Sequence, residues 1–220
     1  MANPQVHARS SARKFGGVWE DYIELHSFLD SSKLHYAKAQ HRALLHHDFG
    51  KKLAIELFCN DFGAHGHAKV EALVFYHFAE DFTKFTPTVT QWFEGSDVNL
   101  RPSLQRTMTL DEHCVESVRQ FGGEQSDYRE LHQFLDSITS EIEAAWGITH
   151  STFGLGLAEM KFGYVVGPRN VPTRTIAERH ILAEYGLIPS VQDWLSAVPL
   201  KPWMYNQAAQ LSVELDTVPA

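Results

Sequence analysis

The sequence predicts a mostly α-helical protein with two homologous helical units of about 100 residues each and a short β-hairpin in the second unit. Two observations carry this prediction, an internal repeat and apolar residues spaced at helical intervals. The composition, 44% hydrophobic over 220 residues, is sufficient to build buried cores. Because helical units this small bury more surface when paired, we expect them to pack as an intrachain pseudo-dimer.

The repeat is clearest in two segments of 17 residues. Residues 15–31 read FGGVWEDYIELHSFLDS and residues 121–137 read FGGEQSDYRELHQFLDS, identical at 12 of 17 positions with an offset of 106. Further along, the segments containing His46 and His77 align with those containing His150 and His180. We therefore divide the chain into a first unit over residues 1–105, a second over 106–205 and a flexible tail over 206–220.

Helices are expected in the first unit over residues 4–14, 18–33, 37–58 and 69–82. The glycine pair at 16–17 ends the first helix through its freedom in φ. In the second helix Tyr22, Leu25 and Leu29 share one face. Residues 59–68, rich in glycine, asparagine and aspartate, predict a loop, and Pro87 opens a short last helix.

The second unit repeats this order with one local difference. Apolar residues alternate around Gly167-Pro168 within residues 162–175, which predicts a β-hairpin. Residues 189–195, PSVQDWL, predict a short terminal helix. Both units keep a glycine inside the third helix, Gly50 and Gly154, where glycine costs about 1 kcal/mol against alanine. We expect another part of the structure to approach the backbone closely there.

Charge and composition argue against several classes of protein. Nineteen Lys and Arg against 27 Asp and Glu give a net charge of -8, which disfavours general nucleic-acid binding. No apolar run approaches the ~20 residues of a membrane span, and no secretory signal is visible. The two cysteines, Cys59 and Cys114, build neither a disulfide framework nor a cysteine zinc site. We expect a cytoplasmic protein with no membrane partner, as a monomer or homodimer.

The chain is rich in histidine, with 13 residues. Tyr22, His26 and Asp30 lie four residues apart, in one row along a helix, and Tyr128, His132 and Asp136 repeat the row. An aspartate one turn from a histidine can fix its tautomer and raise its basicity, which serves metal ligation and general-base catalysis. The alternative is structural, with both side chains packed at the centre of the unit.

Four histidines of the first copy have counterparts in the second, and the pairs are His7 and His113, His26 and His132, His46 and His150, and His77 and His180. Imidazoles from several helices, together with Asp30, would suit zinc or a similar divalent ion if they converge. The candidate metal ligands are His26, His46, His47 and Asp30.

A looser pattern concerns His26 and the pair His47-Asp48. With a later aspartate they imitate the H…HD…D order of metal-dependent phosphohydrolases, which makes His26, His47 and Asp48 the candidate catalytic residues. The second copy reads His150-Ser151-Thr152 at this place and loses the pair. This chemistry would therefore run in the first unit alone.

A longer set of motifs runs through both copies. The first carries His7-Ala8, Ser10-Ser11, Asp30-Ser31-Ser32-Lys33, His41-Arg42-Ala43 and His46-His47; the second carries Ile188-Pro189-Ser190, Asp193-Trp194-Leu195 and Pro202-Trp203-Met204. On these motifs the chain resembles a family from bacteria and their phages, a domain of unknown function whose members usually hold one such unit. The resemblance implies a bacterial or phage origin and no particular reaction. Since each copy keeps different motifs, one composite site shared by both copies is expected.

The preferred hypothesis is a binding protein rather than an enzyme. A pocket at the seam of the pseudo-dimer would take an anionic small molecule such as a nucleotide, or a host protein, as a factor directed against host defence would. The residues expected to line it are Tyr22, His26, Lys33, His41, Arg42, His46, His47, Tyr128, His132, Arg174, Glu178 and His180. A metal-dependent hydrolase in the first unit and a structural protein with core histidines remain the alternatives.

Overall fold

The structure, a computed structural model, describes residues 3–82, 84–96, 106–138 and 143–201. Helices dominate these residues, and the predicted mostly α-helical class is confirmed. Two compact units are present, called unit 1 (Met1–Glu94, with the residues from Val198 on) and unit 2 (Gly95–Ala197). The boundary thus falls earlier than the predicted division between residues 105 and 106, and the predicted tail over 206–220 lies outside the described residues.

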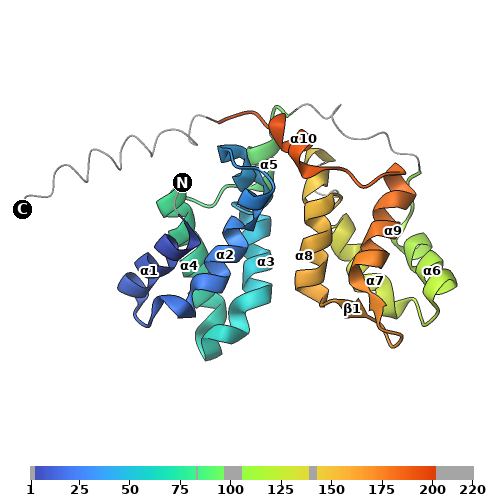
Figure 1. The fold of residues 1–220 in the computed structure, drawn as a ribbon, viewed down its shortest axis with the longest axis horizontal. Coiled ribbons are helices and arrows are strands. Elements are labelled where there is room, and N and C mark those ends of the chain that lie inside the picture. The colour runs from blue at the N-terminus through green and yellow to red at the C-terminus, as the bar shows by residue number, and fades with distance from the viewer. Residues whose placement is uncertain (1–2, 83, 97–105, 139–142, 202–220) are drawn as a thin grey trace, which may run out of the picture. The chain divides into compact units, whose positions relative to one another are not determined.

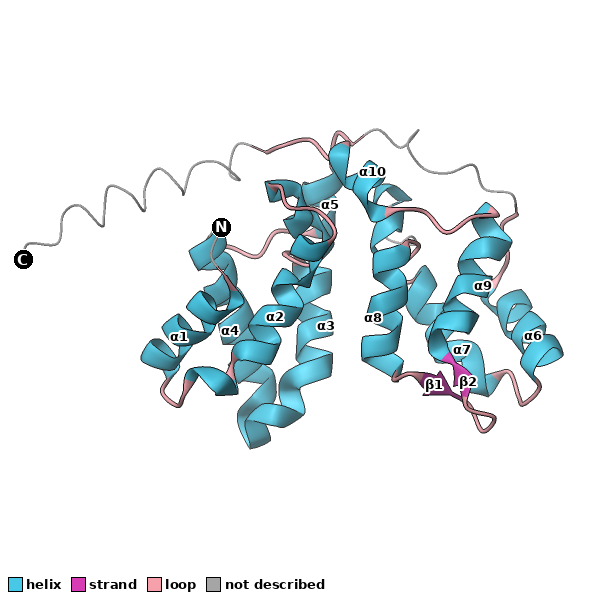
Figure 2. Cartoon of the chain, in the orientation of Figure 1, coloured by secondary structure: helices cyan, strands magenta, loops and turns pink. Residues whose placement is uncertain are grey.

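Unit 1 contains the α-helices α1 (Pro4–Phe15), α2 (Ile23–Asp30), α3 (Asp48–Phe58), α4 (Gly66–Asp81) and α5 (Val89–Phe93), shown in Figures 1 and 2. Four 3-10 helices join them, η1 (Trp19–Asp21), η2 (Ser31–Leu34), η3 (Ala39–Leu44) and η4 (Cys59–His65). Helix α1 begins after Asn3, whose side chain accepts the N–H of Gln5. It ends at Gly16, with φ of 79°, as the glycine pair predicts.

Three predicted bounds in unit 1 are wrong. The helix expected over 18–33 is the short α2 between two 3-10 helices. The helix expected over 37–58 breaks before α3, because the Nδ1 of His47 accepts the N–H of Gly50 and caps a new helix there. The loop expected over 59–68 is η4 followed by the first turn of α4. A Cβ on Gly66 would lie 1.6 Å from the carbonyl oxygen of Cys59, so only glycine fits this junction.

Unit 2 contains α6 (Leu110–Phe121), α7 (Ser126–Asp136), α8 (Thr152–Phe162), α9 (Thr173–Tyr185) and α10 (Val191–Ser196), with the 3-10 helix η6 (Glu143–Ile148). The predicted hairpin is confirmed as β1 (Val165–Val166) and β2 (Val171–Pro172), which pair antiparallel. Its turn holds Gly167 and Asn170 at positive φ. Among the described residues, none of the helices has the length and apolar character needed to cross a membrane.

The helices of the two units correspond in order, α1–α5 with α6–α10. In each unit a tyrosine hydroxyl ties the first helix to the second, since Tyr22 donates to the carbonyl of Gly16 (2.6 Å) and Tyr128 to that of Gly122 (2.7 Å). A Cβ on Gly50 would lie 1.9 Å from the carbonyl oxygen of Leu45. The expected close approach to the backbone is therefore confirmed, and a neighbouring carbonyl makes it.

Candidate metal centres

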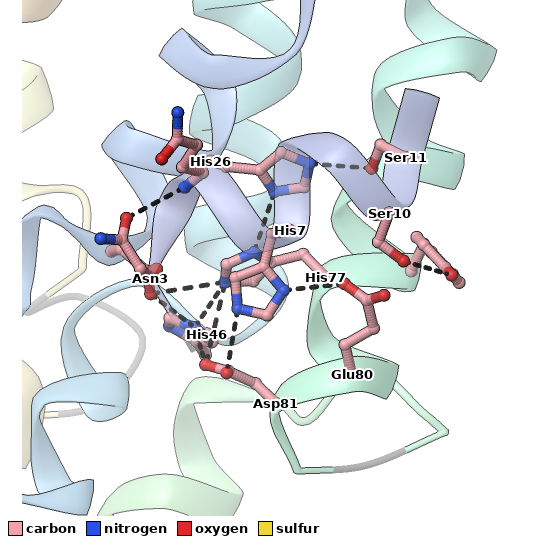
Figure 3. A network of polar contacts seen from close by, with 12 residues as sticks. Asn3, His7, Ser10, Ser11, His26, His46, His77, Glu80 and Asp81 are labelled. Carbon is pink, nitrogen blue, oxygen red and sulfur yellow. Dashed lines mark hydrogen bonds and ion pairs between the residues drawn. The ribbon is translucent and has the colours of Figure 1, made fainter. Parts of the chain in front are cut away.

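A buried group of histidine and carboxylate side chains lies inside unit 1 (Figure 3). Cluster 1 consists of Asp30 at the end of α2, His46 just before α3, and His77 and Asp81 on α4; each offers a ligand atom within 4.8 Å of the others. The Nε2 atoms of His46 and His77 are 3.0 Å apart. Oδ2 of Asp81 lies 3.2 Å from Nε2 of His46, and Oδ1 of Asp30 lies 3.6 Å from Nε2 of His77.

Unit 2 repeats this arrangement in cluster 2, formed by Asp136, His150, His180 and Glu184. The Nε2 atoms of its two histidines are 3.1 Å apart. Oδ1 of Asp136 lies 3.2 Å from Nε2 of His180, and Oε2 of Glu184 lies 3.4 Å from Nε2 of His150. The histidines that have counterparts therefore do converge, once in each unit.

The spacing of these donor atoms matches that of ligands around one ion. Zn–N and Zn–O bonds of ~2.0–2.2 Å place neighbouring ligand atoms about 3.3–3.6 Å apart in a tetrahedron. The pairs in cluster 1 that include a histidine run from 3.0 Å between the two Nε2 atoms to 4.0 Å between Nε2 of His46 and Oδ1 of Asp30. Two imidazoles and two carboxylates can thus hold a divalent ion after small side-chain shifts.

A second layer orients one histidine of each cluster. Nδ1 of His77 lies 3.0 Å from Nδ1 of His26, whose Nε2 lies 2.9 Å from Oγ of Ser11. In unit 2 the corresponding distances are 3.1 Å between His180 and His132 and 2.8 Å between His132 and Ser117. Histidines that ligate metals commonly donate their other ring N–H to such a partner. This row of Ser, His and His leaves the Nε2 of the last imidazole available to a ligand.

Asp81 is the most strongly held carboxylate of cluster 1. It contacts Nε of Arg42 at 3.0 Å, Nε2 of His7 at 3.2 Å and Nε2 of His46 at 3.2 Å. Burial raises the pKa of Asp81, but the hydrogen bonds from His46 and His7 outweigh burial and hold it well below its usual range. Asp81 is therefore ionised at neutral pH, in the state that binds a cation.

Burial keeps several imidazoles in and behind the clusters neutral. It lowers the pKa of His46 and His77, and, with the charge of His7, lowers the pKa of His26 to about 3. In unit 2 burial lowers the pKa of His180 to about 4 and that of His132 to about 2. A metal needs the neutral imidazole with a lone pair, so these environments favour ligation.

His7 is the exception in unit 1. Burial lowers its pKa, but hydrogen bonds to Asp81 and Glu80 outweigh burial and raise it to about 9. Its Nδ1 lies 2.7 Å from Oε2 of Glu80. His7 is thus a buried cation next to cluster 1. It neutralises the charge of the carboxylates and does not act as a metal ligand.

Several polar atoms in and around the clusters lack hydrogen bonds of ordinary geometry within the described residues. They are both oxygens of Asp30 and Nδ1 of His46. Lys33 still pairs with Asp30, with Nζ 2.6 Å from Oδ1. Buried polar atoms are normally satisfied, so such a concentration points to a missing partner.

The structure sorts the predicted site residues into two groups. Asp30, His46 and His180 supply cluster atoms, and His26 and His132 stand behind them. His47 and Asp48 do not join the cluster: His47 caps α3 and contacts the carbonyl of Ala43, and Oδ1 of Asp48 accepts the N–H of Val89. Both side chains of the predicted HD pair are therefore committed to holding the start of a helix.

The remaining predicted residues have local partners. Arg42 and Lys33 pair with cluster carboxylates, and Nδ1 of His41 contacts Oγ of Ser32 at 3.1 Å. Tyr22 and Tyr128 bond the glycine carbonyls described above. On α9, Arg174 pairs with Glu159, and Glu178 is partly exposed.

The candidate metal ligands predicted from the sequence do not include His77 and Asp81. They also do not include the counterparts in unit 2, His180 and Glu184. The signal was present, because His77 and Asp81 are four residues apart, as are His180 and Glu184. That spacing places imidazole and carboxylate on one face of a helix in both copies.

Comparison with known proteins gives one match. No curated protein and no solved structure matches this chain. The family described as a domain of unknown function (DUF6915) matches twice, over residues 2–101 and 108–204. These ranges cover most of the chain and agree with the internal repeat. The chain belongs to this family, and holds its domain in tandem duplicate.

Proposed function

We propose that this chain is a metal-binding protein whose two units each hold one divalent transition-metal ion, at cluster 1 and cluster 2. One observation carries the proposal: the same set of two imidazole nitrogens and two carboxylates converges in both units. The units have diverged around it, since Asp81 is replaced by Glu184 and Trp146 stands at the place of Arg42. A four-donor geometry that persists while its surroundings change is the arrangement expected of a binding site.

The alternative, that these histidines only pack the core, leaves their hydrogen bonding incomplete. Nε2 of His46 faces both Nε2 of His77 and Oδ2 of Asp81, at 3.0 and 3.2 Å. One N–H cannot satisfy both contacts fully, and Asp30 beside them pairs with Lys33 through Oδ1 while its Oδ2 accepts no hydrogen bond from the described residues. A cation at the centre would meet the lone pairs of all four side chains.

The donor set favours particular ions. Two imidazoles and two carboxylates suit borderline ions such as Zn²⁺, Fe²⁺ or Mn²⁺ better than Ca²⁺, which prefers oxygen ligands alone. An ion in such a site supplies a structural cross-link where the site is closed and Lewis acidity where a position stays open. His46 and His77 are fully buried, which fits a structural site in unit 1, whereas a third of the Asp136 side chain is exposed in unit 2.

Elemental analysis of the tag-free full chain by mass spectrometry tests the proposal. After incubation with Zn²⁺, Mn²⁺ or Fe²⁺ and removal of excess ion, we expect about two ions per chain. His46→Gln should leave about one, His150→Gln about one, and the double variant none. His67→Ala, an exposed histidine outside both clusters, is the control and should retain both ions.

Circular dichroism of each variant keeps the test interpretable, because His46 and His150 are buried. Metal-free wild-type protein after all three incubations would refute the proposal. So would unchanged metal content in a folded double variant.

Binding of an anionic small molecule, the hypothesis first drawn from the sequence, is a second candidate that one feature of unit 2 supports, a cavity with two arginines. A host-protein partner, a role against host defence and a phage origin are further proposals that rest on the sequence resemblance. Within the described residues Arg42 and Lys33 already pair with carboxylates, so the geometry favours metal over anion in cluster 1.

A further inference from the structure

Unit 2 contains a cavity of about 420 Å³ between α6 and α9, a volume typical of small-molecule sites. Its buried lining includes His113, His132 and His180, and its exposed lining includes Arg106 and Arg179. Met108, Phe121 and Leu182 add apolar surface. The cavity therefore combines cationic groups at its mouth, imidazoles at its floor and apolar walls.

In the corresponding region of unit 1, three of the aligned positions carry different side chains. Alignment of His180 with His77 places Tyr76 at Arg179 and Glu80 at Ala183, and Ser10 aligns with Glu116. The hydroxyl of Tyr76 lies 2.9 Å from Oγ of Ser10, and Nζ of Lys14 sits 3.9 Å from the centre of the Tyr76 ring.

Glu80 completes the closure, since its carboxylate bonds Nδ1 of His7 at 2.7 Å. Ala183 has no side-chain polar atom that could reach His113 in this way. The imidazole of His113 thus lines an open cavity, whereas that of His7 is covered.

Charge in the cavity of unit 2 favours an anion. Arg179 forms no ion pair with a carboxylate of the described residues, and Arg106 pairs only with Glu112 at an exposed position, where ion pairs contribute little. Glu116 also lines the cavity, but it accepts hydrogen bonds from Nε and Nη2 of Arg119 at 2.7 and 2.6 Å. Arg119 therefore balances this charge mainly from outside the cavity, and Arg179 adds an attraction to Glu116 from within it.

We infer that this cavity of unit 2 binds a small phosphate-bearing molecule, with the phosphate between Arg106, Arg179 and His113 and an apolar group against Phe121 and Met108. Guanidinium groups suit phosphate because their N–H donors match its oxygens in pairs. The imidazoles of His132 and His180 form the floor beneath this site, where their ring nitrogens contact Ser117, each other and His150. This inference concerns a different ligand from the proposed metal ions and does not depend on them.

Isothermal titration calorimetry of the metal-free full chain tests it, with phenyl phosphate and inorganic phosphate as probes. We expect one phenyl phosphate per chain and weaker binding of inorganic phosphate, which lacks the apolar group. Arg106→Gln and Arg179→Gln should each weaken binding about tenfold, since each removes a charge-assisted contact worth ~1.5 kcal/mol or more. Both side chains are exposed, so these variants should fold. Arg174→Gln, which removes an arginine paired outside the cavity, should leave binding unchanged.

The sharpest test places a residue of unit 1 at the aligned position of unit 2. Ala183→Glu, which installs the closure of unit 1, should abolish binding, and Ala183→Gln should weaken it less because it fills space without adding charge. Failure of both probes to bind wild-type protein would refute the inference, as would full binding by Ala183→Glu. Because metal is absent throughout, neither result bears on the metal content of the clusters.

Discussion

Unit 1 and unit 2 share a set of buried donors and differ in what surrounds them. In unit 1 the carboxylate Asp81 is held by Arg42 and His7, and Glu80 covers His7. In unit 2 Glu184 contacts His113 and His150, Ala183 stands at the place of Glu80, and a cavity reaches the histidines. The ligand atoms of the two clusters, and the row of Ser, His and His behind them, are therefore the constant part of the domain. The charges around that part distinguish a closed unit from an open one.

The largest difference in unfolding free energy between the units should appear when Asp81 on α4 and Glu184 on α9 are each replaced by the neutral amide. Asp81→Asn leaves the guanidinium of Arg42, only 6% exposed, without its carboxylate, which should cost ~3–5 kcal/mol of unfolding free energy. Glu184→Gln removes hydrogen bonds to histidines alone and should cost ~1–3 kcal/mol. Urea unfolding of metal-free protein, followed by circular dichroism, measures both. Equal losses would contradict the role given to Arg42.

Gly50 in α3 and Gly154 in α8 test a feature that the two units share, a close approach of a backbone carbonyl oxygen. Gly50→Ala and Gly154→Ala each press a methyl group to within 1.9 Å of a backbone carbonyl oxygen and should lower the unfolding free energy by ~1–3 kcal/mol or more. Gly156 is the matched control, because a Cβ there meets nothing within 4 Å and lysine occupies the aligned position in unit 1. Gly156→Ala should stabilise by up to ~1 kcal/mol. Thermal unfolding measures these effects: Gly50→Ala and Gly154→Ala should lower the Tm, whereas Gly156→Ala should raise it.

The ion pair of His7 should give unit 1 a pH dependence of its own. The folded pKa of His7 is raised to about 9 from 6.5, so its protonation stabilises the fold below pH 6.5 and this contribution is lost as pH rises through 9. Glu80→Gln should therefore cost ~1–2 kcal/mol at pH 6 and little at pH 10, in metal-free protein. Ala183→Gln at the aligned position of unit 2 should show no such trend. If the cost of Glu80→Gln did not change with pH, the ion pair of His7 would not be the source of a pH dependence in unit 1.

The smallest effect tests whether the two units are as alike as their shared residues indicate. Tyr22→Phe and Tyr128→Phe each delete one hydroxyl that donates to a glycine carbonyl at 2.6–2.7 Å. Each should cost about 1 kcal/mol, with no difference between the units. Urea unfolding of both variants measures it, and a clearly unequal pair of values would show that this contact has diverged.

Most of the fold follows from local sequence patterns, and the errors have local causes. The repeat, the glycine stop after α1 and the hairpin around Gly167 are all visible in the sequence and present in the structure. The break before α3 does not follow from the sequence pattern, because histidine is an uncommon N-cap and here the Nδ1 of His47 caps the helix. The composition of residues 59–68 predicts a loop, although η4 continues into α4 there.

The candidate site was predictable only as a set of repeated histidines. That His46 and His77 bring Nε2 atoms within 3.0 Å depends on the packing of α3 and α4, which periodicity does not specify. The pair His47-Asp48 was attractive as a motif, yet its place at a helix start turns both side chains to backbone groups. Conversely, Asp81 is not among the candidate metal ligands predicted from the sequence, although a carboxylate, Glu184, stands at the same place in the second copy.

Two copies so similar within one chain face a hazard during folding, because α6 could dock where α1 belongs. The residues that close unit 1 and open unit 2 oppose this exchange. With α6 in the place of α1, Glu116 would occupy the position of Ser10. It would then lose its attraction to Arg179 and face Tyr76 and the carboxylate of Glu80. With α1 in the place of α6, His7 would lose Glu80. The divergence around His7 and His113 thus also makes each first helix specific for its own unit, which protects the tandem arrangement from domain swapping.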